Sequence, residues 1–76
     1  MENNPSTSQI SLEAARDAGR LHGERAYYAM LSPEMFEEFL RSEAIVWREA
    51  GFSNHCVEVA ETAARAAYRG NAGSSP

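Results

Sequence analysis

Ser32-Pro33-Glu34 is the clearest signal for a helix start in this chain of 76 residues. A serine caps the exposed N–H groups of the first turn, a proline at the next position already has the φ angle of a helix, and an acidic residue suits the positive end of the helix dipole. Leu31 and Phe36 have the spacing of a hydrophobic staple across this start. The stretch therefore predicts a helix that begins at Pro33.

Signals of the same kind predict two further helices. Ser11 can cap a helix that runs to about residue 31, with Glu13 in its first turn. Gly51 is a natural left-handed terminator for the helix that begins at Pro33, and Ser53 can cap a third helix. No period-two alternation flanks these turns, so strands are not expected. The predicted fold class is all-α, a small three-helix bundle with helices over residues 11–31, 33–50 and 54–69.

Composition limits the chain to one small domain. It has a formal net charge of −4, 43% hydrophobic residues and a single cysteine. The ends are poor in apolar residues, which predicts disordered tails over 1–10 and 70–76 around a helical domain over 11–69. The lone cysteine and the lack of a basic, apolar opening segment predict a cytoplasmic protein without a membrane segment. Arginine in place of lysine throughout, with abundant alanine, favours a bacterial or phage origin.

The predicted helices carry apolar faces that are wider than one small bundle needs. The apolar arcs of 33–50 and 54–69 cover roughly 180° and roughly 200°, whereas somewhat over about 100° closes a bundle core. Small residues allow close approach of two helices, and the third helix is rich in alanine. We therefore predict that the first and third helices touch tightly and that the large residues of 33–50 cover the seam. The small edge of the first helix consists of Ala15, Gly19, Gly23 and Ala26.

The surplus of apolar surface favours a second chain as its partner. Ile45 lies in the charged face of 33–50, and Tyr27 lies opposite the apolar arc of the first helix. Together with Trp47 and Phe52, they are the predicted contacts of a homodimer or of a partner interface. Single exposed apolar residues are also common on monomeric proteins, so a monomer without such an interface is the alternative.

Three polar residues, His22, Arg25 and Glu43, fall inside the apolar arcs. In an antiparallel hairpin that turns at Ser32, Glu43 lies within one helical turn of both His22 and Arg25. We expect a buried or interface ion pair between Arg25 and Glu43, with His22 beside it. The simplest role of this cluster is to fix helix register or dimer specificity. An active site is the alternative, although no nucleophile or second acid accompanies the cluster.

No motif in the sequence indicates a catalytic centre, a metal or a cofactor. His55 and Cys56 are adjacent and therefore point about 100° apart on a helix, with no further His or Cys at a chelating spacing. Cys56 falls at the centre of an apolar arc, which indicates a core residue, although a catalytic pair with His22 stays an alternative. We therefore expect a protein that is not an enzyme and that holds no cofactor or metal.

Residues 46–57 resemble a helix-turn-helix motif. Gly51 lies in the turn, with apolar Phe52 and Val57 after it. The segment departs from the motif at Trp47, where a small residue is expected, and the third helix offers no early Arg or Lys to phosphates or guanine. A small DNA-binding transcriptional regulator with a degenerate helix-turn-helix is the alternative function.

The main prediction is a small regulatory module that binds another protein. The dispersed arginines lack the clustered basic footprint that nucleic acid or anionic lipid requires, which leaves protein partners. A short acidic helical chain with excess apolar surface resembles, in type only, the small regulators of bacteria and their phages, such as quorum-sensing antiactivators and anti-CRISPR proteins. This resemblance implies a stoichiometric inhibitor or antiactivator of a bacterial protein.

Overall fold

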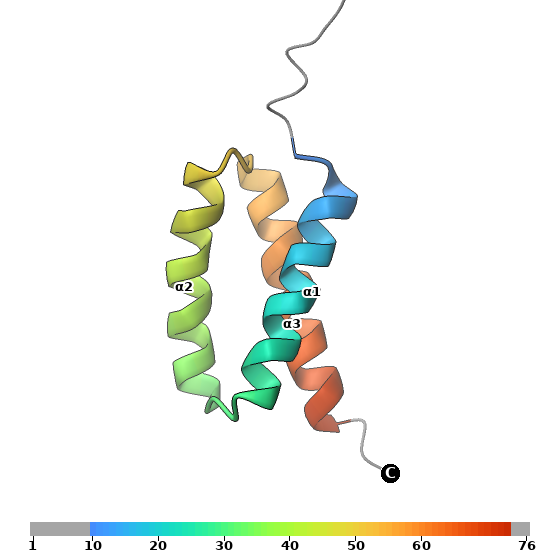
Figure 1. Ribbon diagram of the computed structural model, residues 1–76, viewed down its shortest axis with the longest axis vertical. Helices are drawn as coiled ribbons and strands as arrows, with labels where there is room; N and C mark the ends of the chain where they lie inside the picture. Colours follow the sequence, from blue (N-terminus) through green and yellow to red (C-terminus); the bar gives the residue numbers. More distant parts are fainter. Residues whose placement is uncertain (1–9, 74–76) are drawn as a thin grey trace, which may run out of the picture.

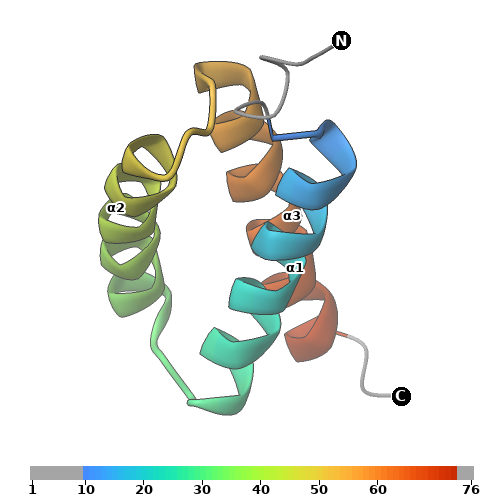
Figure 2. The ribbon, with the colours of Figure 1, turned by 45° about the horizontal axis from the view of Figure 1, so that its top comes forward.

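The computed structural model describes residues 10–73, the last three of them in backbone only, and three α-helices make up this range (Figure 1). They are α1 (Leu12–Tyr28), α2 (Pro33–Glu49) and α3 (Asn54–Gly73). The chain runs along α1, returns along α2 and runs again in the first direction along α3, so α1 and α3 are parallel neighbours (Figure 2). The predicted all-α three-helix bundle is confirmed over the described range.

The three predicted serine caps are confirmed. The hydroxyl oxygens of Ser11, Ser32 and Ser53 each accept a hydrogen bond from the backbone N–H three residues later, at 3.0, 3.2 and 3.1 Å. Pro33 is the first residue of α2, where its missing N–H costs no hydrogen bond. Local sequence therefore determines where each helix begins.

The turn between α2 and α3 closes as the sequence predicts. Gly51 has a φ of 112°, and its N–H donates to the carbonyl of Arg48 at 3.1 Å. The N–H of Phe52 donates to the carbonyl of Trp47 at 2.9 Å. These two bonds form a Schellman motif, in which a left-handed glycine ends the helix.

The turn between α1 and α2 has the same hydrogen bonds but no glycine. Met30 takes the left-handed position with a φ of 63°, and its N–H donates to the carbonyl of Tyr27 at 3.0 Å. The N–H of Leu31 donates to the carbonyl of Ala26 at 3.1 Å. Because Met30 leaves the helical conformation, α1 ends at Tyr28 rather than near residue 31.

Helices α1 and α3 touch backbone to backbone, as their small residues predict. A Cβ atom on Gly19 would lie 1.9 Å from the carbonyl oxygen of Ala60, and one on Gly23 would lie 2.2 Å from that of Ala64. Both glycines are buried. Only glycine at these two positions allows this approach, so α1 and α3 form the closely packed pair of the bundle.

Helix α2 covers the α1–α3 pair with large side chains. It stands farther from the other two helices than they stand from each other (Figures 1 and 2). The rings of Phe36 on α2 and Tyr68 on α3 stack with centroids 4.1 Å apart. The predicted covering role of α2 is thus confirmed, and its buried residues are Phe36, Leu40, Ala44 and Trp47.

The ends of the helical domain differ from the prediction. Ile10 packs against the core, and its carbonyl accepts a hydrogen bond from the Cys56 thiol at 3.2 Å, so residue 10 belongs to the packed domain rather than to the predicted tail. Helix α3 continues to Gly73 instead of ending near residue 69. The remaining tail segments, 1–9 and 74–76, lie outside the described residues. Within residues 10–73 no helix has the length and apolar character needed to cross a bilayer.

Candidate protein-binding surface

The predicted polar cluster forms around a different pair. Nε2 of His22 lies 3.0 Å from Oε1 of Glu43, so His22, not Arg25, is the partner of this carboxylate. The ring of His22 also contacts the rings of Phe39 and Trp47 on α2, at centroid distances of 5.8 and 5.4 Å. His22 therefore occupies the side of α1 that faces α2, whereas Arg25 is exposed and makes no ion pair with a described residue.

Both ring nitrogens of His22 are engaged. Nδ1 lies 2.7 Å from the carbonyl oxygen of Ala18, which can only accept, so this nitrogen carries a proton and donates. Nε2 faces the carboxylate of Glu43. A ring held at both nitrogens has neither one free to take a proton from a substrate or to attack it. The arrangement suits a structural link between α1 and α2.

Replacing Glu43 by glutamine tests this link. We expect the free energy of unfolding to fall by about 1 kcal/mol, because the glutamine amide removes the negative charge that faces the imidazole ring. The melting temperature should fall by about 4–8 °C, with an unchanged helical circular dichroism spectrum. Glu38→Gln, at an exposed position of the same helix, is the control and should melt like the wild type. An unchanged melting temperature for Glu43→Gln would show that its carboxylate is merely solvated.

A second ion pair joins α2 to α3. Arg65 donates to both carboxylate oxygens of Glu37, at 2.9 and 3.1 Å. These hydrogen bonds lower the pKa of Glu37 and raise the pKa of Arg65. The stabilisation from Glu37 is present above the pKa of an unfolded glutamate and is lost as the pH falls through the lowered value. The side chains are 41% and 36% exposed, so the contribution is small.

The predicted interface residues occupy three different environments. Trp47 is only 5% exposed and belongs to the core, so the expectation that it contacts a partner is corrected. Phe52 is half-buried and stacks on Trp47, with ring centroids 5.7 Å apart. Tyr27 is half-buried, and Ile45 is 58% exposed. Of the four, Ile45 and part of Tyr27 offer the most surface to a partner.

The largest exposed apolar side chains gather at the turn between α1 and α2. Met30 is 88% exposed and Tyr28 is 73% exposed. The rings of Tyr27 and Tyr28 meet edge to face, with centroids 5.2 Å apart. The sequence did not identify Tyr28 and Met30 as exposed interface residues, because the predicted helix ran to residue 31 and so included the segment that forms the turn. We call this region the turn surface; a hollow of about 490 Å³ there is lined by Tyr27, Tyr28, Met30, Leu31 and Tyr68.

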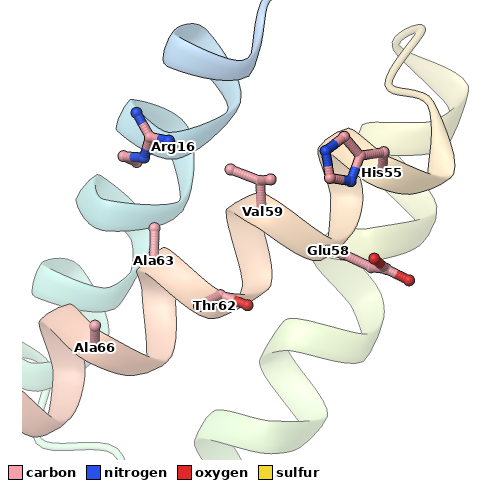
Figure 3. A pocket seen from close by; sticks show the side chains of 7 residues that line it. All are labelled: Arg16, His55, Glu58, Val59, Thr62, Ala63 and Ala66. Carbon is pink, nitrogen blue, oxygen red and sulfur yellow. The ribbon is translucent and has the colours of Figure 1, made fainter.

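A shallow groove follows the outer side of the α1–α3 pair, and Figure 3 shows one part of it. It consists of two adjoining hollows, of about 370 and about 440 Å³, which share Arg16, Ala63 and Ala66. The groove reaches from His55 at one end to Gly70 at the other. None of its lining residues comes from α2. We call it the outer groove.

The remaining candidates for chemistry do not come together. Cys56 is 4% exposed, and its thiol donates to a backbone carbonyl. His55 is exposed on the outer groove. No group of three or more His, Cys, Asp or Glu among the described residues could hold a metal ion.

Comparison of the chain with models of protein families, with curated proteins and with solved structures gave no match.

Proposed function

We propose that the protein is a regulator that acts by stoichiometric binding of another protein at the turn surface, as an inhibitor or antiactivator. The observation that carries this proposal is the state of Met30. Its side chain is 88% exposed, and its backbone has a left-handed conformation that methionine disfavours. The proposal involves no catalysis and no cofactor.

The two turns of the chain make a direct comparison for Met30. Both close with the same pair of hydrogen bonds, and both need a left-handed residue. The second turn has Gly51 there, whereas the first has Met30. A left-handed conformation costs a residue with a Cβ roughly 1–2 kcal/mol, and an 88% exposed side chain returns almost no packing energy. Glycine at this position would stabilise the turn better than Met30 does. The methionine is therefore more useful in contact with another molecule than in the fold itself.

The neighbours of Met30 supply the chemistry of a protein interface. Tyrosine and methionine are enriched where two proteins meet, because they bring large contact areas, and methionine also adapts its shape to a partner. The turn itself is held in place, since the Tyr68 hydroxyl donates to the carbonyl of Leu31 while its ring stacks on Phe36. A turn backbone fixed before binding loses little backbone entropy on binding. These features fit an apolar segment of a folded partner, such as the apolar face of a helix.

Replacing Met30 by glycine should make the protein more stable and a worse binder. Removal of the left-handed strain should raise the free energy of unfolding by about 1 kcal/mol, and the melting temperature by about 4–8 °C. Loss of a central contact should weaken binding by about 30-fold, the equivalent of about 2 kcal/mol. The immobilised chain would first capture its partner from a bacterial lysate, and titration calorimetry with the purified partner would then compare wild type, Met30→Gly and Tyr28→Ser.

Val46→Ser is the matched control for this experiment. Val46 is 51% exposed, but it lies on α2 away from the turn surface. It should bind the partner within about twofold of the wild type, because it removes apolar surface outside the interface. A captured protein that binds Met30→Gly and Tyr28→Ser as tightly as the wild type would refute the proposal.

A further inference from the structure

We propose that the hollow at the turn surface receives an arginine side chain of the partner protein. This inference rests on the proposed function and deepens it, because it names the chemistry of the partner at that same surface. Three tyrosine side chains line the hollow, and its lining residues in the described part of the chain are all uncharged. A hollow of this kind attracts a cation that can lie against aromatic faces.

The tyrosine rings come from two helices and have different orientations. The ring planes of Tyr27 and Tyr28 on α1 lie at 74° to each other, with centroids 5.2 Å apart. The Tyr68 ring on α3 is held in place, since it stacks on Phe36 and its hydroxyl donates to the carbonyl of Leu31. The face of an aromatic ring carries partial negative charge, so the rings of both helices attract a cation in the hollow between them.

The charges around the turn also favour a cation. Tyr27 and Tyr28 lie in the last turn of α1, whose C-terminus is the negative end of the helix dipole. The positive end of α2 follows the same turn, but the Ser32 hydroxyl caps it and Glu34 lies in its first turn. The whole chain has a net charge of −4. A cationic group is therefore attracted to this end of the molecule more than an anionic one.

The arginines nearest in sequence to these tyrosines belong to other sites. Arg25 lines a different hollow, between α1 and α2. Arg65 and, with a smaller effect, Arg69 lower the pKa of Glu37 on α2, so the charge of Arg69 acts on that carboxylate. None of these arginines is among the residues that line the hollow at the turn surface. The tyrosine faces are thus open to a cation from another chain.

Arginine suits the hollow better than lysine or a wholly apolar side chain. Its planar guanidinium stacks on aromatic faces and is more weakly hydrated than an ammonium group, so it loses less on leaving water. Its methylene stem packs on apolar surface while the charged end reaches farther. Met30 and Leu31 supply apolar surface beside the rings. An arginine on the otherwise apolar face of a partner helix therefore fits both parts of the turn surface.

NMR titration of the isotope-labelled full chain with capped glycine–X–glycine peptides tests the proposal. X is arginine, lysine, citrulline or norleucine. Citrulline has the shape of arginine without its charge, and norleucine has only an apolar stem. We expect the arginine peptide to bind at millimolar concentration and to shift the signals of Tyr27, Tyr28 and Tyr68. It should bind about tenfold more tightly than the citrulline and norleucine peptides, and more tightly than the lysine peptide.

Tyr28→Leu and Tyr28→Phe are the matched variants. Tyr28 is 73% exposed, so neither change disturbs the core, and melting curves establish that both variants are folded. Leucine keeps an apolar side chain but removes the aromatic face, so Tyr28→Leu should bind the arginine and citrulline peptides more nearly alike. Phenylalanine keeps the aromatic face, so Tyr28→Phe should retain the preference for arginine.

Three results would overturn the proposal. The first is equal binding of the arginine and citrulline peptides by the wild type, and the second is equal or tighter binding of the lysine or norleucine peptide. The third is an arginine peptide that leaves the three tyrosine signals unchanged, including one that binds only at acidic residues of α2 such as Glu34 and Glu38.

The proposed function is tested separately. A captured partner that binds Met30→Gly as tightly as the wild type refutes that function, whatever the peptides do. A partner that needs Met30 supports it even where the peptides show no preference for arginine.

Discussion

Gly19→Ala is expected to lower the melting temperature by about 12–24 °C, the equivalent of about 3 kcal/mol of lost stability. The added Cβ would lie 1.9 Å from the carbonyl oxygen of Ala60 and 2.6 Å from its carbonyl carbon. Both atoms belong to the backbone of α3 and cannot rotate away. Helices α1 and α3 must therefore separate, which loosens the packing of buried neighbours such as Ala15. The gain of about 1 kcal/mol in helix propensity is too small to offset this loss.

Gly70→Ala is the internal control for this substitution. Gly70 also lies within a helix, but a Cβ there would meet no atom within 4 Å. The same chemical change should therefore raise the free energy of unfolding, by up to about 1 kcal/mol, through helix propensity alone. Thermal and urea denaturation followed by circular dichroism measure both variants. If both substitutions stabilise the protein, the close contact of α1 with α3 is refuted.

The close contact of α1 with α3 was predictable because its cause is periodic in the sequence. Gly19 and Gly23 recur on one side of α1, and Ala60 and Ala64 recur on one side of α3. Small residues at that spacing leave backbone exposed along a whole helix edge, and only another small edge fits there. The serine caps were predictable for a similar reason, since each involves only residues within one turn of the helix start.

Helical spacing alone does not predict which residues of the polar cluster form an ion pair. His22 and Arg25 lie on similar sides of α1, about 60° apart, and either could reach Glu43. The rotation of α1 about its axis decides between them, and the contact at Gly19 and Gly23 sets that rotation. It directs His22 towards α2 and leaves Arg25 exposed. The sequence pattern does not fix the rotation of α1 this closely, so it does not decide whether His22 or Arg25 is the partner of Glu43.

The turn surface was not predictable, because no local signal marks it. A left-handed residue after a helix is most often glycine, and Met30 gives no such indication. The pattern of apolar residues continues through residues 28–31, which favoured a longer helix. The exposure of Met30 and Tyr28 follows only from the turn that ends α1. The outer groove, likewise, exists only after two distant segments have packed side by side.

Trp47→Ala is expected to remove about 3–5 kcal/mol, which is most of the stability of a domain of this size. Helix α2 stands off from α1 and α3, so a few large side chains hold it in place. Trp47 is 5% exposed and contacts the rings of His22 on α1 and Phe52 in the following turn. Its removal leaves a cavity that the backbone contact between α1 and α3 prevents from closing. We therefore expect α2 to detach and the midpoint of unfolding to shift to a lower urea concentration.

Urea denaturation followed by circular dichroism measures this change, because the variant lacks the chain's one tryptophan as a fluorescent probe. Val46→Ala, at the neighbouring exposed position, should stay within about 0.5 kcal/mol of the wild type. The pair of variants separates two roles for a large aromatic residue on α2. A core residue changes stability at every protein concentration, whereas an interface residue changes stability only where copies associate. If dilute Trp47→Ala unfolds at the same urea concentration as the wild type, Trp47 is an interface residue, as the sequence alone indicated, and not a core residue.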